Sequence, residues 1–76
     1  MSWDEVKNQI SSARTSDERR RAVEAMMQHI PQEKQQKLMV TMGQNGLNAV
    51  SLGSLPSAVA TNTDLFNKIK HIVTGL

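Results

Sequence analysis

The side chains most able to do chemistry in this chain are two histidines, two pairs of adjacent acids and a group of basic residues. His29 and His71 lie far apart in the sequence, and neither has another histidine or an acid at the spacing that metal ligands need. The chain contains no Cys, which excludes disulfides, thiolate metal sites and cysteine nucleophiles. We therefore expect no metal site and no cofactor. His29 is better explained as a helix C-terminal residue, where a basic side chain is favourable.

The acidic pairs Asp4-Glu5 and Asp17-Glu18 are poorly placed for acid–base catalysis. Neighbouring side chains on a helix diverge by about 100°, so the two carboxyl groups of a pair cannot serve one substrate. The chain also lacks a phosphate-binding glycine motif and a serine-nucleophile motif. We expect a protein that is not an enzyme and has no small-molecule substrate, with these acids placed in helix caps.

Basic residues that neutralise phosphates would give an alternative function, nucleic-acid binding with salt-dependent affinity. Three consecutive arginines spread over about 200° of a helix, and acids three or four positions away can pair with them. An exposed helix face with internal ion pairs is therefore the simpler interpretation. The residues that would carry the alternative are Arg14, Arg19, Arg20, Arg21, Lys34 and Lys37.

A helix-turn-helix motif is the form that this nucleic-acid alternative would take. The helix before Gly43 would be the first element, Gly43 the turn, and residues 47–52 the recognition helix. That recognition helix would carry no Lys or Arg, and only Asn45, Asn48 and Ser51 could contact bases. Nucleic-acid binding is therefore the second hypothesis.

The most unusual feature of the sequence is its uncharged middle. Residues 38–63 contain no Asp, Glu, Lys or Arg, although the chain has nine basic and seven acidic residues elsewhere. Some apolar side chains in this range, namely Met39, Met42, Val50 and Leu55, are expected to pack inward, and complete burial of the range is the alternative. Depletion of charge is typical of interface cores, and an exposed apolar patch usually marks a partner site. The candidate interface residues are Leu47, Asn48, Val50, Ser51, Leu52, Leu55 and Val59.

Capping boxes predict where the first two helices begin. In a capping box a Ser or Thr side chain accepts from an amide three positions later, and a Glu there reaches back. Ser2 with Glu5, and Thr15 with Glu18, have this spacing. The first helix should therefore begin at Trp3 and the second directly after Thr15.

Proline and glycine predict the boundaries that follow. Pro31 should end the second helix, and the third should run over residues 31–42 with Gly43 just beyond its end, forming a hairpin with the second. Glu33 and Lys37 have the spacing of an ion pair on that helix. Short helices are expected around 47–52 and 56–60. A last helix should follow a cap at residues 61–63 and end near Gly75.

These elements predict one all-α domain over residues 1–76, a compact bundle of four or five short helices. The second, third and last helices should supply the core, and the first should dock through Trp3, Val6 and Ile10. The alternative is a helical protomer whose core is completed only in a dimer.

The composition also bounds the setting and the partners. No apolar run is long enough to span a membrane, and no signal peptide is visible, so we expect a cytoplasmic protein. Segment 64–73 resembles a cationic membrane-surface helix, but the core needs its apolar face, so no membrane partner is expected. The preferred hypothesis is a small regulatory protein that docks onto a larger macromolecule, or onto a second copy of itself, through residues 43–60.

Overall fold

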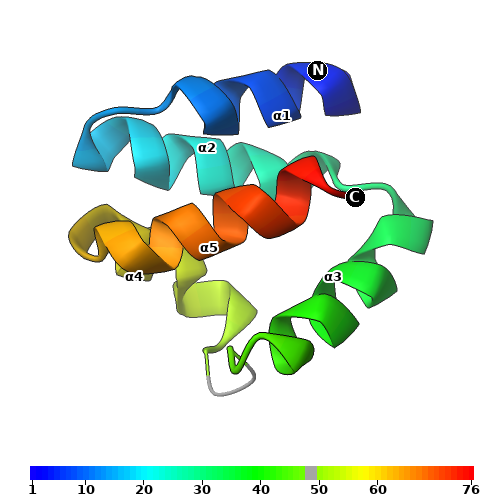
Figure 1. Ribbon diagram of the computed structural model, residues 1–76. Coiled ribbons are helices and arrows are strands. Elements are labelled where there is room, and N and C mark those ends of the chain that lie inside the picture. The colour runs from blue at the N-terminus through cyan, green and yellow to red at the C-terminus, as the bar shows by residue number, and fades with distance from the viewer. Residues whose placement is uncertain (48–49) are drawn as a thin grey trace.

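Five α-helices and one 3-10 turn make up the fold of the computed structural model, which describes residues 1–47 and 50–76 (Figure 1). None of the described residues forms a strand, so the predicted all-α bundle is confirmed. Within the same ranges no helix has both the length and the apolar character to cross a membrane. The elements are α1 (Trp3–Ser12), α2 (Ser16–His29), α3 (Gln32–Gln44), the 3-10 turn η1 (Leu52–Ser54), α4 (Leu55–Thr61) and α5 (Thr63–Thr74).

The first two helices begin where the capping boxes predict. The hydroxyl of Ser2 accepts a hydrogen bond from the amide of Glu5 at 3.2 Å, and that of Thr15 accepts from the amide of Glu18 at 3.1 Å. The carboxylate of Glu18 accepts in return from the amides of Thr15 and Arg14, both at 3.0 Å. Donors that have no partner within the helix are thus satisfied at the start of α2.

The end of α3 differs from the prediction. Gly43 lies inside the helix, which continues to Gln44, and Gly46 has the positive φ of 75° that glycine adopts without a Cβ clash. The amide of Leu47 donates to the carbonyl oxygen of Met42 at 2.8 Å, and that of Gly46 donates to Gly43 at 3.1 Å. This pair of bonds is a Schellman motif, which brings the residue after the glycine back against the last turn of the helix.

All five α-helices contribute side chains to the core, including α4, a helix of only seven residues. α2 packs against α4 more extensively than any other two elements pack together, while α1 packs against α2 and α5. The fully buried side chains include Val6, Ile10, Ala22, Val23, Met26, Leu55, Val59, Ile69 and Val73. α1 contributes Val6 and Ile10 as predicted, and Trp3 packs against the edge of the same cluster. The second, third and last helices all supply buried side chains, as predicted, with Leu38 and Met42 coming from α3, and α4 adds Leu55 and Val59.

Helix α3 lies at the edge of the fold. It turns away from α2 after Pro31 instead of forming the predicted hairpin, and it packs mainly against α5 (Figure 1). Leu38 and Met42 are its only buried side chains. The predicted pair of Glu33 and Lys37 is absent from the ion pairs of the described residues. Because one narrow stripe holds α3 in place, both flanks of this helix border open surface.

Candidate functional site

Three of the predicted interface residues belong to the core. Leu55 and Val59 are fully buried and Leu47 is only 7% exposed, so the prediction that they form a surface is wrong. Leu55 and Val59 share one face of α4, which lies against α2, while Leu47 closes the end of α3 through the Schellman motif. Asn48, also predicted, lies outside the described residues.

The other three predicted interface residues lie nearer to the surface. Ser51 is exposed, and its hydroxyl accepts from the amide of Ser54 at 3.3 Å, which caps η1. Val50 and Leu52 are partly buried and pack against the edge of the core. A helix was expected over 47–52. Among the described residues of that range, Leu47, Val50 and Ser51 are not helical, and Leu52 begins the 3-10 turn η1.

Met39 is the functional candidate that the prediction missed. It was expected to pack inward, yet it is 59% exposed, and its neighbour Val40 is 54% exposed. Leu38 and Met42 face the core, and each further residue turns about 100° around the helix axis. Met39 therefore points to one flank of α3 and Val40 to the outer side. The run Leu38-Met39-Val40 could have indicated an exposed apolar residue, because one face of a helix cannot bury three consecutive side chains.

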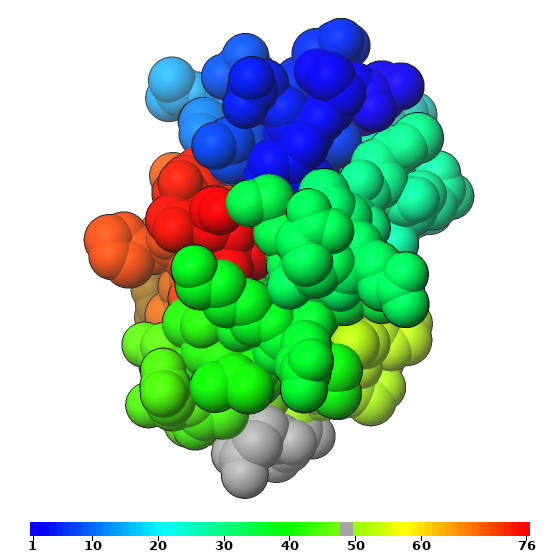
Figure 2. Space-filling model, turned by 90° about the vertical axis from the view of Figure 1, so that its right-hand side faces the viewer, coloured from blue at the N-terminus to red at the C-terminus, as the bar shows by residue number. Residues whose placement is uncertain are grey.

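Two adjoining hollows flank Met39, and together they form what we call the apolar groove. The first has a volume of about 220 Å³, the second about 150 Å³, and both are lined by Met39 and Leu52. Figure 2 shows α3 in green on this face, with the yellow-green segment that contains η1 beside it. The remaining lining residues are Met26, Met27, Ile30, Gln35 and Leu38 in the first hollow, and Met42, Leu47 and Val50 in the second.

The lining of the apolar groove is uncharged and recessed. Among the described residues that line its two hollows, none is Asp, Glu, Lys, Arg or His. Only Gln35 and Met39 among them are exposed, and the rest are buried or partly buried. The groove can therefore accept apolar side chains, and it offers no charged group to a polar ligand.

The three consecutive arginines are engaged within the fold. Arg20 pairs with Asp17 and with Glu24, the latter at 2.8 Å, and Arg21 pairs with Asp17 at 2.9 Å. The hydrogen bond and the charge of Asp17 raise the pKa of Arg20 above its ordinary value. Arg19 donates to the carbonyl oxygens of Val59 and Ala60, near the C-terminal end of α4. This is the ion-paired helix face that the spacing favoured.

The other basic candidates do not join the arginines in one cluster. Lys34 donates to the carbonyl oxygen of Leu76 at 2.6 Å, and Lys37 lines a cleft between α3 and α5. Arg14 is exposed in the connection between α1 and α2. The helix-turn-helix geometry is also absent from the described residues, because Gly43 lies within α3 and not in a turn.

Glu18 has a structural role as a helix-capping carboxylate. Backbone hydrogen bonds from Arg14 and Thr15 hold the pKa of Glu18 below its ordinary value, as expected for a capping carboxylate. His29 lies in the last turn of α2. Residues 1–47 and 50–76 contain no group of three or more His, Asp or Glu side chains that could hold a metal ion.

Comparison with known proteins supplies no relative from which a function could be transferred. No protein-family model, no curated protein and no solved structure matches this chain. The surfaces on either flank of α3 are therefore the basis on which a function can be proposed.

Proposed function

We propose that this protein is a non-enzymatic binding module whose apolar groove accepts the apolar face of an amphipathic helix from a larger protein. The observation that carries the proposal is the 59% exposed side chain of Met39, which stands between two apolar hollows. Methionine is flexible and polarisable, and it is over-represented on surfaces that bind apolar helices. An exposed methionine beside empty apolar space can repack around an inserted side chain.

The shape of the groove favours a helix as the occupant. Its two hollows adjoin one another, because Met39 and Leu52 line both. A helix presents apolar side chains three and four positions apart, with Cβ atoms about 5–6 Å from one another. Two successive anchors of one helix can therefore fill the two hollows, with Met39 between them.

The size of the groove favours a helix over a second copy of this chain. A stable protein interface buries about 800 Å² on each partner, and the whole chain exposes 4623 Å². A dimer would thus need roughly a sixth of the surface, whereas Gln35 and Met39 are the only exposed residues in the described lining of the groove. A narrow, recessed site of this kind matches an inserted helix edge.

The uncharged lining limits what that helix can carry. A charged group buried in the groove would lose its hydration without gaining a partner, which costs several kcal/mol in order of magnitude. The inserted residues are therefore apolar, and charges on the partner helix lie on its other face.

The experiment selects, from a library of displayed helical peptides, those that bind the full chain. It then measures the affinity of the selected peptides for three proteins. These are the wild type, Met39→Glu, and the control Val40→Glu. The two substitutions are adjacent on α3 and similarly exposed, but only Met39 lines the groove. Burying a methionine is worth about 1.5–3 kcal/mol, so Met39→Glu should weaken binding at least about tenfold. Val40→Glu should leave the affinity close to that of the wild type.

Three results would overturn the proposal. Peptides that bind all three proteins equally would place their site elsewhere, and a selection that yields no binding peptide would remove the groove as a helix site. Light scattering provides the third, since a wild-type dimer that Met39→Glu converts into a monomer would make a second copy the occupant. Circular dichroism establishes that each variant keeps its helical content.

A further inference from the structure

The opposite flank of α3 borders a second surface, a cleft of about 660 Å³ between α3 and α5 that is open to solvent. Its polar lining comes from one stripe on each helix. Lys37, Thr41 and Asn45 follow one another at intervals of four residues along α3, which places them on a common face. Lys68 and His71 face them from α5, together with Ile72.

Three basic residues are among those that line this cleft. Lys37, Lys68 and His71 line the cleft, and none of its described lining residues is Asp or Glu. Glu33 and Asp64 lie one helical turn before the two lysines, but among the described residues neither acid forms an ion pair with them. The ammonium groups of Lys37 and Lys68 are therefore not neutralised by these acids.

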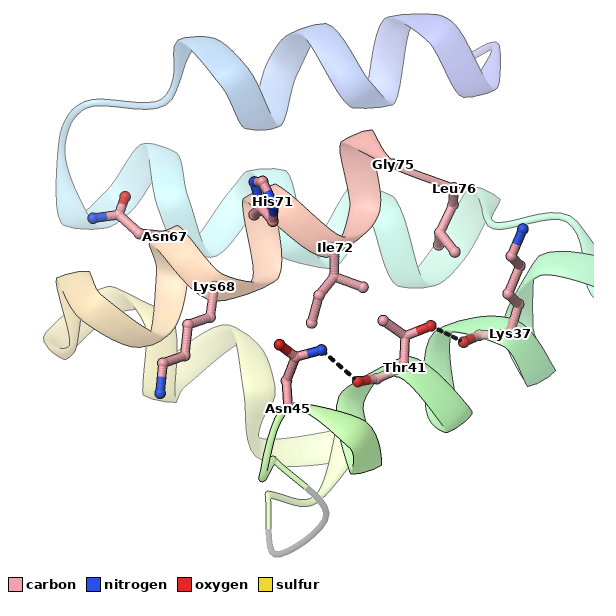
Figure 3. A pocket seen from close by; sticks show the side chains of 9 residues that line it. All are labelled: Lys37, Thr41, Asn45, Asn67, Lys68, His71, Ile72, Gly75 and Leu76. Atoms are coloured by element: carbon pink, nitrogen blue, oxygen red, sulfur yellow. Dashed lines mark hydrogen bonds between the residues drawn. The ribbon is translucent and has the colours of Figure 1, made fainter.

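The arrangement of the side chains separates charge from an apolar floor. Figure 3 shows Lys37 and Lys68 at opposite ends of the cleft, with Ile72 projecting from α5 toward α3 between them. Asn45 and Thr41 donate to the carbonyl oxygens of Thr41 and Lys37, both at 2.8 Å, which orders the wall formed by α3.

At one end of this cleft, a lysine offsets the partial negative charge of a helix C-terminus. Helix C-termini carry partial negative charge, and α5 ends beside the cleft at Gly75. Lys34 donates to the carbonyl oxygen of Leu76 at 2.6 Å and so supplies a positive charge at that end. The carbonyl oxygen of Leu76 at that end of the cleft is therefore already paired with a cation.

We propose that this cleft binds a phosphate-bearing ligand of the nucleotide type, with phosphate at a lysine at an end of the cleft and the base over the apolar floor. Ammonium groups bind phosphate oxygens through charge-assisted hydrogen bonds. The volume lies within the range of small-ligand sites, about 300–1,000 Å³. Ile72 offers the apolar contact that a bare inorganic anion would not use. The phosphates can belong to a free nucleotide or to a single strand of nucleic acid.

The test follows backbone amide NMR signals of the full chain during titration at low ionic strength with adenosine triphosphate, with hexathymidylate and with inorganic phosphate. Shifts should cluster at the residues of the cleft, and Lys37→Gln or Lys68→Gln should each weaken binding about three- to tenfold. Lys70→Gln is the matched control, because Lys70 lies on the same helix but outside the cleft, with its Nζ 5.9 Å from the centre of the Phe66 ring.

The titrations also identify the source of the phosphate. Tighter binding of the triphosphate than of hexathymidylate assigns a free nucleotide. The reverse assigns a single strand, and each lysine removed should then reduce the log–log salt slope by about 0.7. Equal weakening by Lys70→Gln, shifts spread over the whole surface, or inorganic phosphate binding as tightly as both other probes would overturn the proposal. Met39→Glu should leave these titrations unchanged, so this proposal and the proposed helix groove fail independently.

Discussion

The Nε group of Arg19 donates a hydrogen bond to the carbonyl oxygen of Val59 at 3.0 Å, across 40 positions of sequence. The Nη2 group of the same arginine donates to Ala60 at 2.9 Å. Both carbonyl groups lie in the last turn of α4, where carbonyl oxygens have no partner within the helix and a cation is favourable. Arg19 thus joins the start of α2 to the end of α4.

Replacing Arg19 by Ala should destabilise the fold by about 1.5–3 kcal/mol, the usual value of a hydrogen bond to a charged group. Arg14→Ala is the control, because it removes the same charge from an exposed residue nearby in the sequence. Urea denaturation followed by circular dichroism measures both free energies of unfolding. Equal free energies of unfolding for the two variants would mean that the hydrogen bonds to α4 add no stability beyond the effect of removing one positive charge.

The two glycines near the end of α3 should respond to alanine in opposite directions. Gly46→Ala places a Cβ at a φ of 75° and should cost about 1–2 kcal/mol. Gly43→Ala adds a Cβ inside the helix with no atom within 4 Å, and should stabilise by about 0.5–1 kcal/mol. Thermal melts of the two variants give the signs directly. Stabilisation by Gly46→Ala would contradict the Schellman ending of α3.

Leucine truncations should separate the core from the apolar groove. Leu55 is fully buried, so Leu55→Ala should cost about 2–5 kcal/mol in free energy of unfolding. Leu52 is only partly buried at the groove, and Leu52→Ala should cost roughly 1 kcal/mol. Chemical denaturation of both variants checks this order. A larger cost at Leu52 would place the groove lining, and not α4, at the centre of the packing.

The capping carboxylate of Glu18 should make stability depend on pH in the acid range. Its pKa is lowered in the folded state by backbone hydrogen bonds from Arg14 and Thr15, so folding favours the ionised form. The stabilisation is therefore complete above the ordinary pKa of 4.5 and is lost as the pH falls through the lower folded value.

Glu18→Gln keeps an acceptor oxygen in the cap but does not titrate. Between neutral pH and about pH 3, the wild type should lose more stability than this variant. Urea denaturation at the two pH values measures the difference. Parallel losses in both proteins would show that other groups carry the acid sensitivity.

Much of the helical structure could be predicted because it depends on local contacts. The capping boxes at Ser2 and Thr15 each involve residues three positions apart, and Pro31 restricts the residue directly before it. The prediction for the end of α3 failed because Gly43 and Gly46 both satisfy the local rule. The contact between Leu47 and Met42 selects Gly46.

The candidate groove could be predicted only in part. The absence of charge over residues 38–63 left two interpretations open, burial in the core and contact with a partner. The inward packing expected for Leu55 is confirmed, whereas that expected for Met39 is wrong, because both are apolar residues at helical positions and only the packing of neighbouring helices distinguishes them.

By itself the sequence determined that the chain is helical, where most helices begin, and which side chains share a helix face. Only the tertiary structure decided that α4 packs against α2 and that α3 lies at the edge with an apolar groove on one flank and a basic cleft on the other. Helical spacing is a property of neighbouring residues along the chain. Burial depends on what packs against each face, and here the partners of α2 and α3 lie on α4 and α5, distant in sequence.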